Sequence, residues 1–406
     1  MADECFDLPD DVLVQVMLLL PTSSRRRFRL VCKRWRDLID ERTPEGRSRT
    51  KILVFFAERG ESRALVFDDE HGGRRRAWTY PWTTDTATIH IVGTCNGLLC
   101  FHEWSVPSCI NAGSSSVISV TNPITGETQV LPPVPTQRES EQFEESRRLE
   151  SESETYGKFG KYSFGYHPIT GEYKVVHIPY QRHQEVDAVW VFTLGADTTA
   201  WREVPVTAPG ASYSRNHGEV VSVDGVMYWL NAASNRIMEL DLGDERATWL
   251  DVPPSVWAGG LTPEEGGGGW RLTSVHARLG IAATTPWGGV DVWVLDGRPR
   301  WARGRTLPEP PGHHGSWSWI TAPRLTFGEY AMTMSRSWSC DGRSITRLYR
   351  HKVGSLIGRD DDDGRLLPLP EGVAELVMDE DDGTMPYYSK MMTFAYVQTL
   401  EPLPGY

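Results

Sequence analysis

From residue 51 onward, short apolar runs alternate with turn residues, and this pattern constrains the fold more than any other feature of the chain. Examples are KILVFF (51–56), SVISVTN (116–122), YKVVHI (173–178) and VDVWVLD (290–296). Gly, Pro, Asn and Asp cluster between the runs, and helical periodicity ceases after residue 41. Short strands at regular spacing are typical of all-β sandwiches, barrels and propellers. We therefore expect residues 45–406 to form one all-β domain.

A loose internal repeat favours a propeller among these folds. Apolar strands that begin at a glycine turn recur at NGLLCF (96), GEYKVV (171), DGVMYW (224), LGIAAT (279) and FGEYAM (327). The later intervals are about 50 residues, which is within the size range of propeller blades. We expect about six blades, and we expect the last apolar segment, residues 389–400, to pair with the first blade. Such pairing would close a ring and leave no open sheet edge.

Two stretches of biased composition interrupt the repeat. Residues 137–158 are charged, rich in serine and nearly free of apolar side chains, and residues 258–270 are rich in glycine. Such compositions cannot bury enough apolar surface to fold by themselves. We interpret the first as a flexible charged insertion and the second as a glycine-rich loop, both within the β domain.

The first 44 residues carry a different pattern, that of short helices. Residues 8–21, LPDDVLVQVMLLLP, are apolar almost all the way round a helix, and residues 24–40 follow as an amphipathic helix with a basic face. The first segment is shorter than the about 20 apolar residues of a membrane-spanning helix. Acidic residues precede it where a signal peptide would be basic. A short helix with two apolar sides needs two partners, its sister helix and an outside surface.

These two segments closely resemble the F-box, a helical motif that docks onto the adaptor Skp1 in cullin–RING ubiquitin ligases. The resemblance rests on LP at 8–9, the spaced apolar helix and VCKRW at 31–35. It implies a small all-α F-box over residues 1–44, built as a helical hairpin or three short helices. The adaptor-binding residues that it implies are Leu8, Pro9, Val12, Leu13, Val16, Met17, Leu20, Pro21, Val31, Cys32 and Trp35.

The chain departs from the plant F-box pattern at Arg25 and Arg26, where that pattern usually has leucine. This departure predicts weaker packing or weaker adaptor affinity. The surrounding basic cluster has two interpretations, a nuclear import or nucleic-acid contact and the solvent face of an amphipathic helix. We favour the solvent face. An alternative to adaptor docking is a helical hairpin that packs on the chain's own large domain.

The β domain resembles the plant F-box-associated domain, a kelch-like β-propeller or propeller-like substrate receptor. The resemblance rests on GTCNGLLCF, VTNPITGETQVLPP, FGYHPITGEYKVVHI, TLGADTTAWREVPV and VDGVMYWL. Together the two resemblances imply the substrate-recognition subunit of an SCF (Skp1–cullin–F-box) ubiquitin ligase. The implied partners are a Skp1-like adaptor, through it a cullin and a RING protein, and an unknown target protein.

No motif of a catalytic or metal site occurs in the sequence. G-x-S-x-G, G-x-x-x-x-G-K-[ST] and H-E-x-x-H are missing. The six cysteines lack zinc spacing, and we interpret the adjacent His313 and His314 as part of a polar loop. We therefore expect no enzyme activity, metal or cofactor. The net charge of -12 disfavours nucleic-acid binding, and sparse cysteines favour a reducing compartment, the cytoplasm or the nucleus.

Aromatic and arginine side chains in loops are the candidate target contacts, because such residues dominate protein interfaces. The candidates are Trp270, Trp317, Trp319, Tyr213 and Arg215. The alternative is that the tryptophans pack between blades. A second function stays open, in which the propeller binds a carbohydrate or other small ligand in an aromatic-lined pocket, with or without ligase assembly. A catalytic propeller is a third.

Overall fold

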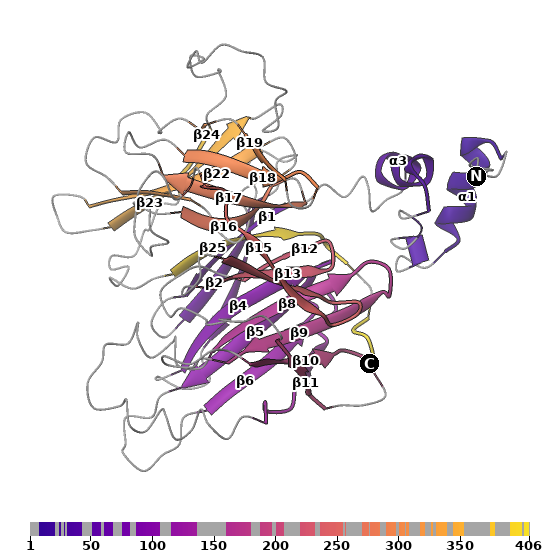
Figure 1. Ribbon diagram of the computed structural model, residues 1–406, viewed down its shortest axis with the longest axis horizontal. Coiled ribbons are helices and arrows are strands. Elements are labelled where there is room, and N and C mark those ends of the chain that lie inside the picture. The colour runs from indigo at the N-terminus through magenta and orange to yellow at the C-terminus, as the bar shows by residue number, and fades with distance from the viewer. Residues whose placement is uncertain are drawn as a thin grey trace.

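A computed structural model gives the fold of the chain (Figure 1). Helices come first, and the remaining elements are β-strands. The structure describes residues 8–20, 24–25, 28, 31–42, 51–57, 61–67, 75–81, 87–105, 115–135, 160–179, 187–196, 200–206, 220–231, 236–254, 256, 270–275, 277–284, 290–297, 300–304, 306–307, 317–320, 326–327, 330–338, 344–352, 374–377, 390–399 and 402–405.

Helices α1 (Asp10–Leu18) and α3 (Lys33–Arg42) form the N-terminal unit. Helix α1 begins directly after Pro9, and its first turn carries Asp10 and Asp11, whose carboxylates favour the positive end of the helix dipole. The core between the helices consists of Leu13, Val14, Met17, Leu38 and Ile39. The structure describes no helix that is long and apolar enough to cross a bilayer.

The β domain consists of antiparallel sheets, which we number one to six. Sheets one to three have the strand orders β25 (Lys390–Tyr396), β1 (Lys51–Ala57), β2 (Glu61–Phe67), β3 (Arg75–Pro81); β4 (Ala87–Cys95), β5 (Leu98–Ser105), β6 (Ser115–Thr121), β7 (Thr128–Val130); and β8 (Lys161–His167), β9 (Glu172–Ile178), β10 (Ala188–Thr193), β11 (Arg202–Pro205).

Sheets four to six continue in chain order. Their strands are β12 (Val221–Val223), β13 (Val226–Asn231), β14 (Arg236–Asp241), β15 (Ala247–Asp251); β16 (Trp270–Val275), β17 (Arg278–Thr284), β18 (Val290–Leu295), β19 (Trp301–Arg303); and β20 (Trp317–Ile320), β22 (Tyr330–Trp338), β23 (Ser344–Lys352), β24 (Ala374–Val377). In sheet six, β21 (Thr326–Phe327) also pairs with β22.

Apolar clusters join consecutive sheets, as expected for a β-propeller. Each of five clusters takes side chains from two neighbouring sheets. Representative pairs, from the first interface to the fifth, are Phe55 with Phe101, Leu98 with Phe164, Val191 with Trp229, Leu250 with Trp270, and Val292 with Ala331. The sequence predicts about six blades; the described strands form six sheets, and the described core clusters join five consecutive pairs of them.

The C-terminal strand closes the first sheet. Strand β25 pairs with β1 from Lys51–Tyr396 to Ala57–Lys390, antiparallel and without a break in register. This pairing confirms the prediction that residues 389–400 join the first blade. One edge of β1 is therefore covered by the end of the chain, so the domain needs both of its ends to complete a single sheet.

Beyond β25 the chain crosses to sheets two and three, and we call residues 397–399 and 402–405 the C-terminal strap. The Asn122 side chain donates to the carbonyl of Thr399 at 3.2 Å, and the Leu403 amide donates to the Glu127 carboxylate at 2.9 Å. Leu403 is 1% exposed and belongs to the core between sheets two and three. The strap thus connects sheet one to both of its successors.

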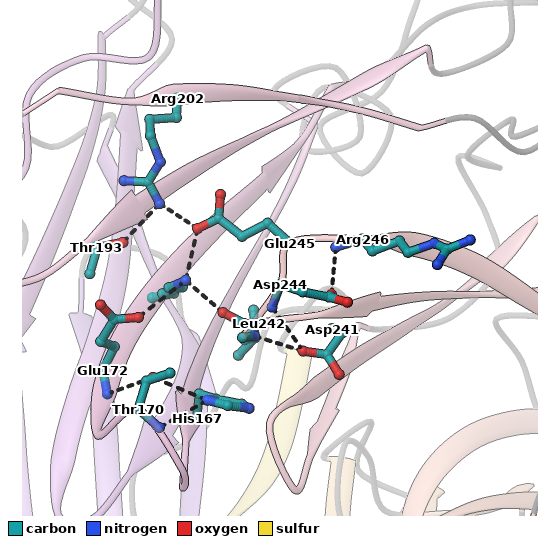
Figure 2. Close-up of polar contacts among 12 residues, drawn as sticks. His167, Thr170, Glu172, Thr193, Arg202, Asp241, Leu242, Asp244, Glu245 and Arg246 are labelled. Carbon is teal, nitrogen blue, oxygen red and sulfur yellow. Dashed lines mark hydrogen bonds and ion pairs between the residues drawn. The ribbon is translucent and has the colours of Figure 1, made fainter.

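An ion-pair network around the buried Lys174 joins sheets three and four (Figure 2). The Nζ of Lys174 lies 2.8 Å from the Glu245 carboxylate, 2.6 Å from the Leu242 carbonyl and 3.3 Å from the Glu172 carboxylate. Arg202 also donates to Glu245. Burial alone would raise the pKa of Glu245, but hydrogen bonds and charge from Lys174 and Arg202 lower it overall. Every charge in the network has an opposite partner within the propeller.

Candidate functional site

One side of α1 presents apolar side chains to solvent, and this side is the candidate functional site. Leu8, Val12, Val16 and Leu19 are 40%, 44%, 46% and 86% exposed. Residues three or four apart are neighbours on a helix surface, so these side chains form a continuous apolar row. We call these four residues the docking stripe.

The opposite side of α1 explains why the docking stripe is exposed. Leu13, Val14 and Met17 belong to the core shared with α3, and none of them is more than 7% exposed. Helix α3 therefore covers only one of the two apolar sides of α1. A unit this small cannot bury all of its apolar surface, and a contiguous exposed apolar patch marks an interaction site.

Arg34 of α3 holds the N-terminal end of the stripe. Its Nη2 donates to the carbonyl of Leu8 at 2.6 Å and to the Asp10 carboxylate at 2.7 Å, and its Nε donates to the same carboxylate at 2.9 Å. Hydrogen bonds with ionised partners are stronger than neutral ones. Arg42 forms a second ion pair between the helices with Asp11. The first turn of α1 is thereby tied to α3.

Arg25 lies at the other end of α1. Its Nη1 donates to the carbonyls of Met17 and Leu18, each at 3.4 Å. The last turn of α1 contains no basic residue of its own, so Arg25 supplies the cation that the negative end of a helix dipole favours. The interpretation of the basic cluster as a solvent face is therefore incomplete. Arg25 and Arg34 are only partly exposed, and both contact α1.

The structure places the predicted adaptor contacts in three environments. Those on the surface are Leu8, Pro9, Val12, Val16 and Val31, those in the α1–α3 core are Leu13 and Met17, and those of intermediate exposure are Leu20, Cys32 and Trp35. Pro21 lies outside the described residues. Leu19 was missed, although its spacing from Val12 and Val16 is a helical signal that could have identified it.

Of the five candidate target contacts, the structure describes the side chain of Trp270 alone. Trp270 is 1% exposed and packs in the core between sheets four and five, which matches the alternative of packing between blades. Trp317 and Trp319 belong to β20, whose side chains lie outside the description. Tyr213 and Arg215 lie outside the described residues.

A metal centre is not formed by the residues that the structure describes, because no three or more His, Cys, Asp or Glu side chains among them gather as ligands. His313 and His314 lie outside the described residues. The docking stripe is a separate feature, a row of exposed apolar side chains. It fits a complementary apolar surface on another protein.

The described residues thus form a small helical unit with an exposed apolar stripe, followed by a β-propeller. The family model described as F-box associated beta propeller domain matches residues 52–318, and the model of the F-box domain matches residues 5–44. The chain belongs to the F-box associated beta propeller domain family and carries an F-box domain in front of the propeller.

Proteins of Arabidopsis thaliana are among the curated relatives of this chain. One F-box protein is 26% identical over 314 residues, which cover 71% of this chain and 70% of the relative. An F-box/kelch-repeat protein is 24% identical, over 61% of this chain and 58% of its own length. Among solved structures, the WD40 domain of SCAP from fission yeast aligns with 83% of this chain and 80% of its own, at 8% identity and a TM-score of 0.32.

Proposed function

We propose that this chain is the substrate-recognition subunit of an SCF ubiquitin ligase. The observation that carries the proposal is the docking stripe on α1, exposed in a chain whose first residues match the F-box domain. The stripe would dock a Skp1-like adaptor, which connects to a cullin and a RING protein. The propeller would hold a target protein, whose ubiquitination leads to proteasomal degradation.

Such a subunit needs no active site of its own. It raises the effective concentration of a target beside the charged ubiquitin-conjugating enzyme, and geometry alone supplies the acceleration. A propeller suits this role because its rigid sheets can carry variable loops. We accordingly infer a non-catalytic receptor that acts in the cytoplasm, the nucleus or both, where the ligase components and their targets would meet it.

Adaptor binding is tested by one substitution in the stripe and one beside it. Val16→Glu places a charge within the apolar row, whereas Gln15→Glu places the same charge on a neighbouring exposed position outside it. In a titration of the full chain with a purified Skp1-like adaptor, Val16→Glu should lose binding and Gln15→Glu should keep it. Equal affinity of both variants and the wild type would contradict docking through the stripe.

The receptor role is tested by affinity capture in cells in which the proteasome and neddylation are inhibited. The wild-type chain should capture adaptor, cullin and one or more targets. The Val16→Glu chain should retain the targets and lose adaptor and cullin, because its propeller is unchanged. Loss of all three classes together would mean that the propeller does not bind targets independently of the F-box.

A further inference from the structure

We propose that Arg34 is a positioning residue for the docking stripe, acting on it through the backbone carbonyl of Leu8. This inference rests on the proposed function and deepens it, because it names a residue outside the stripe on which adaptor affinity depends. The Arg34 guanidinium bonds to Leu8 and Asp10 and does not belong to the apolar row. Its effect reaches the partner through the orientation of Leu8.

The geometry singles out the Leu8 carbonyl. Leu8 precedes α1, so its carbonyl lies outside the hydrogen-bond ladder that holds the helix, and the ladder begins only where the amides of Val12 and Leu13 donate to Pro9. The Arg34 Nη2 contact of 2.6 Å to this carbonyl is shorter than the two contacts of 2.7 and 2.9 Å that Arg34 makes with the Asp10 carboxylate. Without it, Leu8 would be free to leave the row that continues at Val12.

Asp10 separates two explanations for this contact. Arg34 bonds to the Asp10 carboxylate as well as to Leu8, so an effect of Arg34 could arise from the ion pair alone. Asp10→Asn removes the negative charge but leaves the guanidinium opposite the Leu8 carbonyl. Arg34→Met removes both contacts and keeps the length of the aliphatic stem.

Arg42 provides the matched control. It also joins α3 to the first turn of α1 by an ion pair, but its partner Asp11 is 83% exposed and neither residue belongs to the stripe. Arg42→Met therefore removes an interhelical ion pair without touching the backbone of a stripe residue. General loosening of the helix pair would affect the Arg34 and Arg42 variants alike.

The experiment measures adaptor affinity of the full chain by titration, using wild type, Arg34→Met, Asp10→Asn and Arg42→Met. Loss of a charge-assisted hydrogen bond should weaken binding by Arg34→Met roughly threefold to thirtyfold. Asp10→Asn and Arg42→Met should stay within about twofold of wild type, as exposed ion pairs contribute little. The proposal is overturned if Asp10→Asn weakens binding as much as Arg34→Met does, or if Arg34→Met binds the adaptor with wild-type affinity.

Hydrogen exchange of the free chain keeps this inference separate from the proposed function. The amides of Val12 and Leu13 form the first turn that follows Leu8, and they should exchange faster in Arg34→Met than in Arg42→Met. Equal exchange in the two variants overturns the positioning role, whether or not the adaptor binds. Failure of the wild type to bind a Skp1-like adaptor would instead refute the proposed function, while the exchange rates still decide the role of Arg34.

Discussion

The ammonium of Lys174 on β9 lies 2.8 Å from the carboxylate of Glu245, in the turn between β14 and β15, and thereby joins sheets three and four. The Lys174 side chain is 4% exposed and the Glu245 side chain 19%. A charge buried to this extent is tolerated only with a partner. The pair therefore helps to fix the position of sheet three relative to sheet four. Its two residues lie 71 positions apart in sequence.

Glu245→Gln should destabilise the propeller by about 3 kcal/mol, because it leaves the buried Lys174 with a weaker set of partners. The free energy of unfolding, measured by chemical denaturation, checks this value. Arg278→Met is the control, since Arg278 and Asp296 form an ion pair in which both side chains are 48% exposed. That change should alter stability by less than about 1 kcal/mol. Equal effects of the two substitutions would contradict a special role for the buried pair.

His102 should make the propeller less stable in mild acid. Burial, with a smaller contribution from the charge of His177, lowers the pKa of His102 to about 3. The unfolded chain binds a proton at His102 below about pH 6.5, whereas the folded chain does not until about pH 3, so stability falls as pH decreases between these values. Between pH 7 and pH 5, His102→Gln should lose about 2 kcal/mol less than the wild type. If the difference in denaturation midpoint between His102→Gln and the wild type were the same at pH 7 and at pH 5, the assignment of this acid sensitivity to His102 would be refuted.

Gly97 and Gly126 illustrate two different reasons why a position requires glycine, backbone conformation and lack of space for a side chain. Both have positive φ, +89° and +78°, which opposes any side chain by about 1–2 kcal/mol. A Cβ at Gly97 would also lie 2.3 Å from the Val397 carbonyl oxygen, whereas a Cβ at Gly126 would meet nothing within 4 Å.

Gly97→Ala should therefore destabilise by roughly 1–3 kcal/mol more than Gly126→Ala. It should also speed amide exchange in the C-terminal strap, which packs on that turn. Chemical denaturation and hydrogen exchange measure the two effects. Matching values for both variants would mean that the strap does not pack on Gly97.

Met17 and Val16 are adjacent but should respond oppositely to alanine. Met17 is 1% exposed in the α1–α3 core, so Met17→Ala should destabilise the helical unit by about 2–4 kcal/mol. Val16 is 46% exposed, so Val16→Ala should leave stability within about 0.5 kcal/mol while weakening adaptor binding. Thermal unfolding followed by helical circular dichroism, alongside adaptor titration, distinguishes the two. A stability loss from Val16→Ala as large as that from Met17→Ala would contradict the division of α1 into two faces.

Much of the β domain could be predicted from local patterns. Three of the five repeated glycines, Gly97, Gly171 and Gly225, have positive φ and lie in turns between the first and second strands of a sheet. Gly280 instead lies within β17, and Gly328 lies outside the described residues. The same reasoning found the pairing of the last segment with the first blade, because an apolar strand at the end of the chain needs a partner strand. Both signals are local, so a single sequence carries them.

The partners of individual side chains could not be predicted in this way. Trp270 was a candidate target contact, yet it fills the space between two sheets. The strap contact between Leu403 and Glu127 joins residues 276 positions apart. Composition and spacing do not specify which residues meet across such separations, and an exposed and a buried tryptophan look the same in sequence.

The sequence by itself determined a pair of short helices, a following series of short strands and the likeness to the F-box, because hydrophobic period and turn residues act over a few positions. Only the tertiary structure decided which apolar side of α1 is covered and which remains as the docking stripe. It also decided that Arg25 and Arg34 hold the two ends of α1 rather than merely facing solvent. These outcomes depend on packing between distant segments, because the burial and the charge partners of a side chain are set only when the chain has folded.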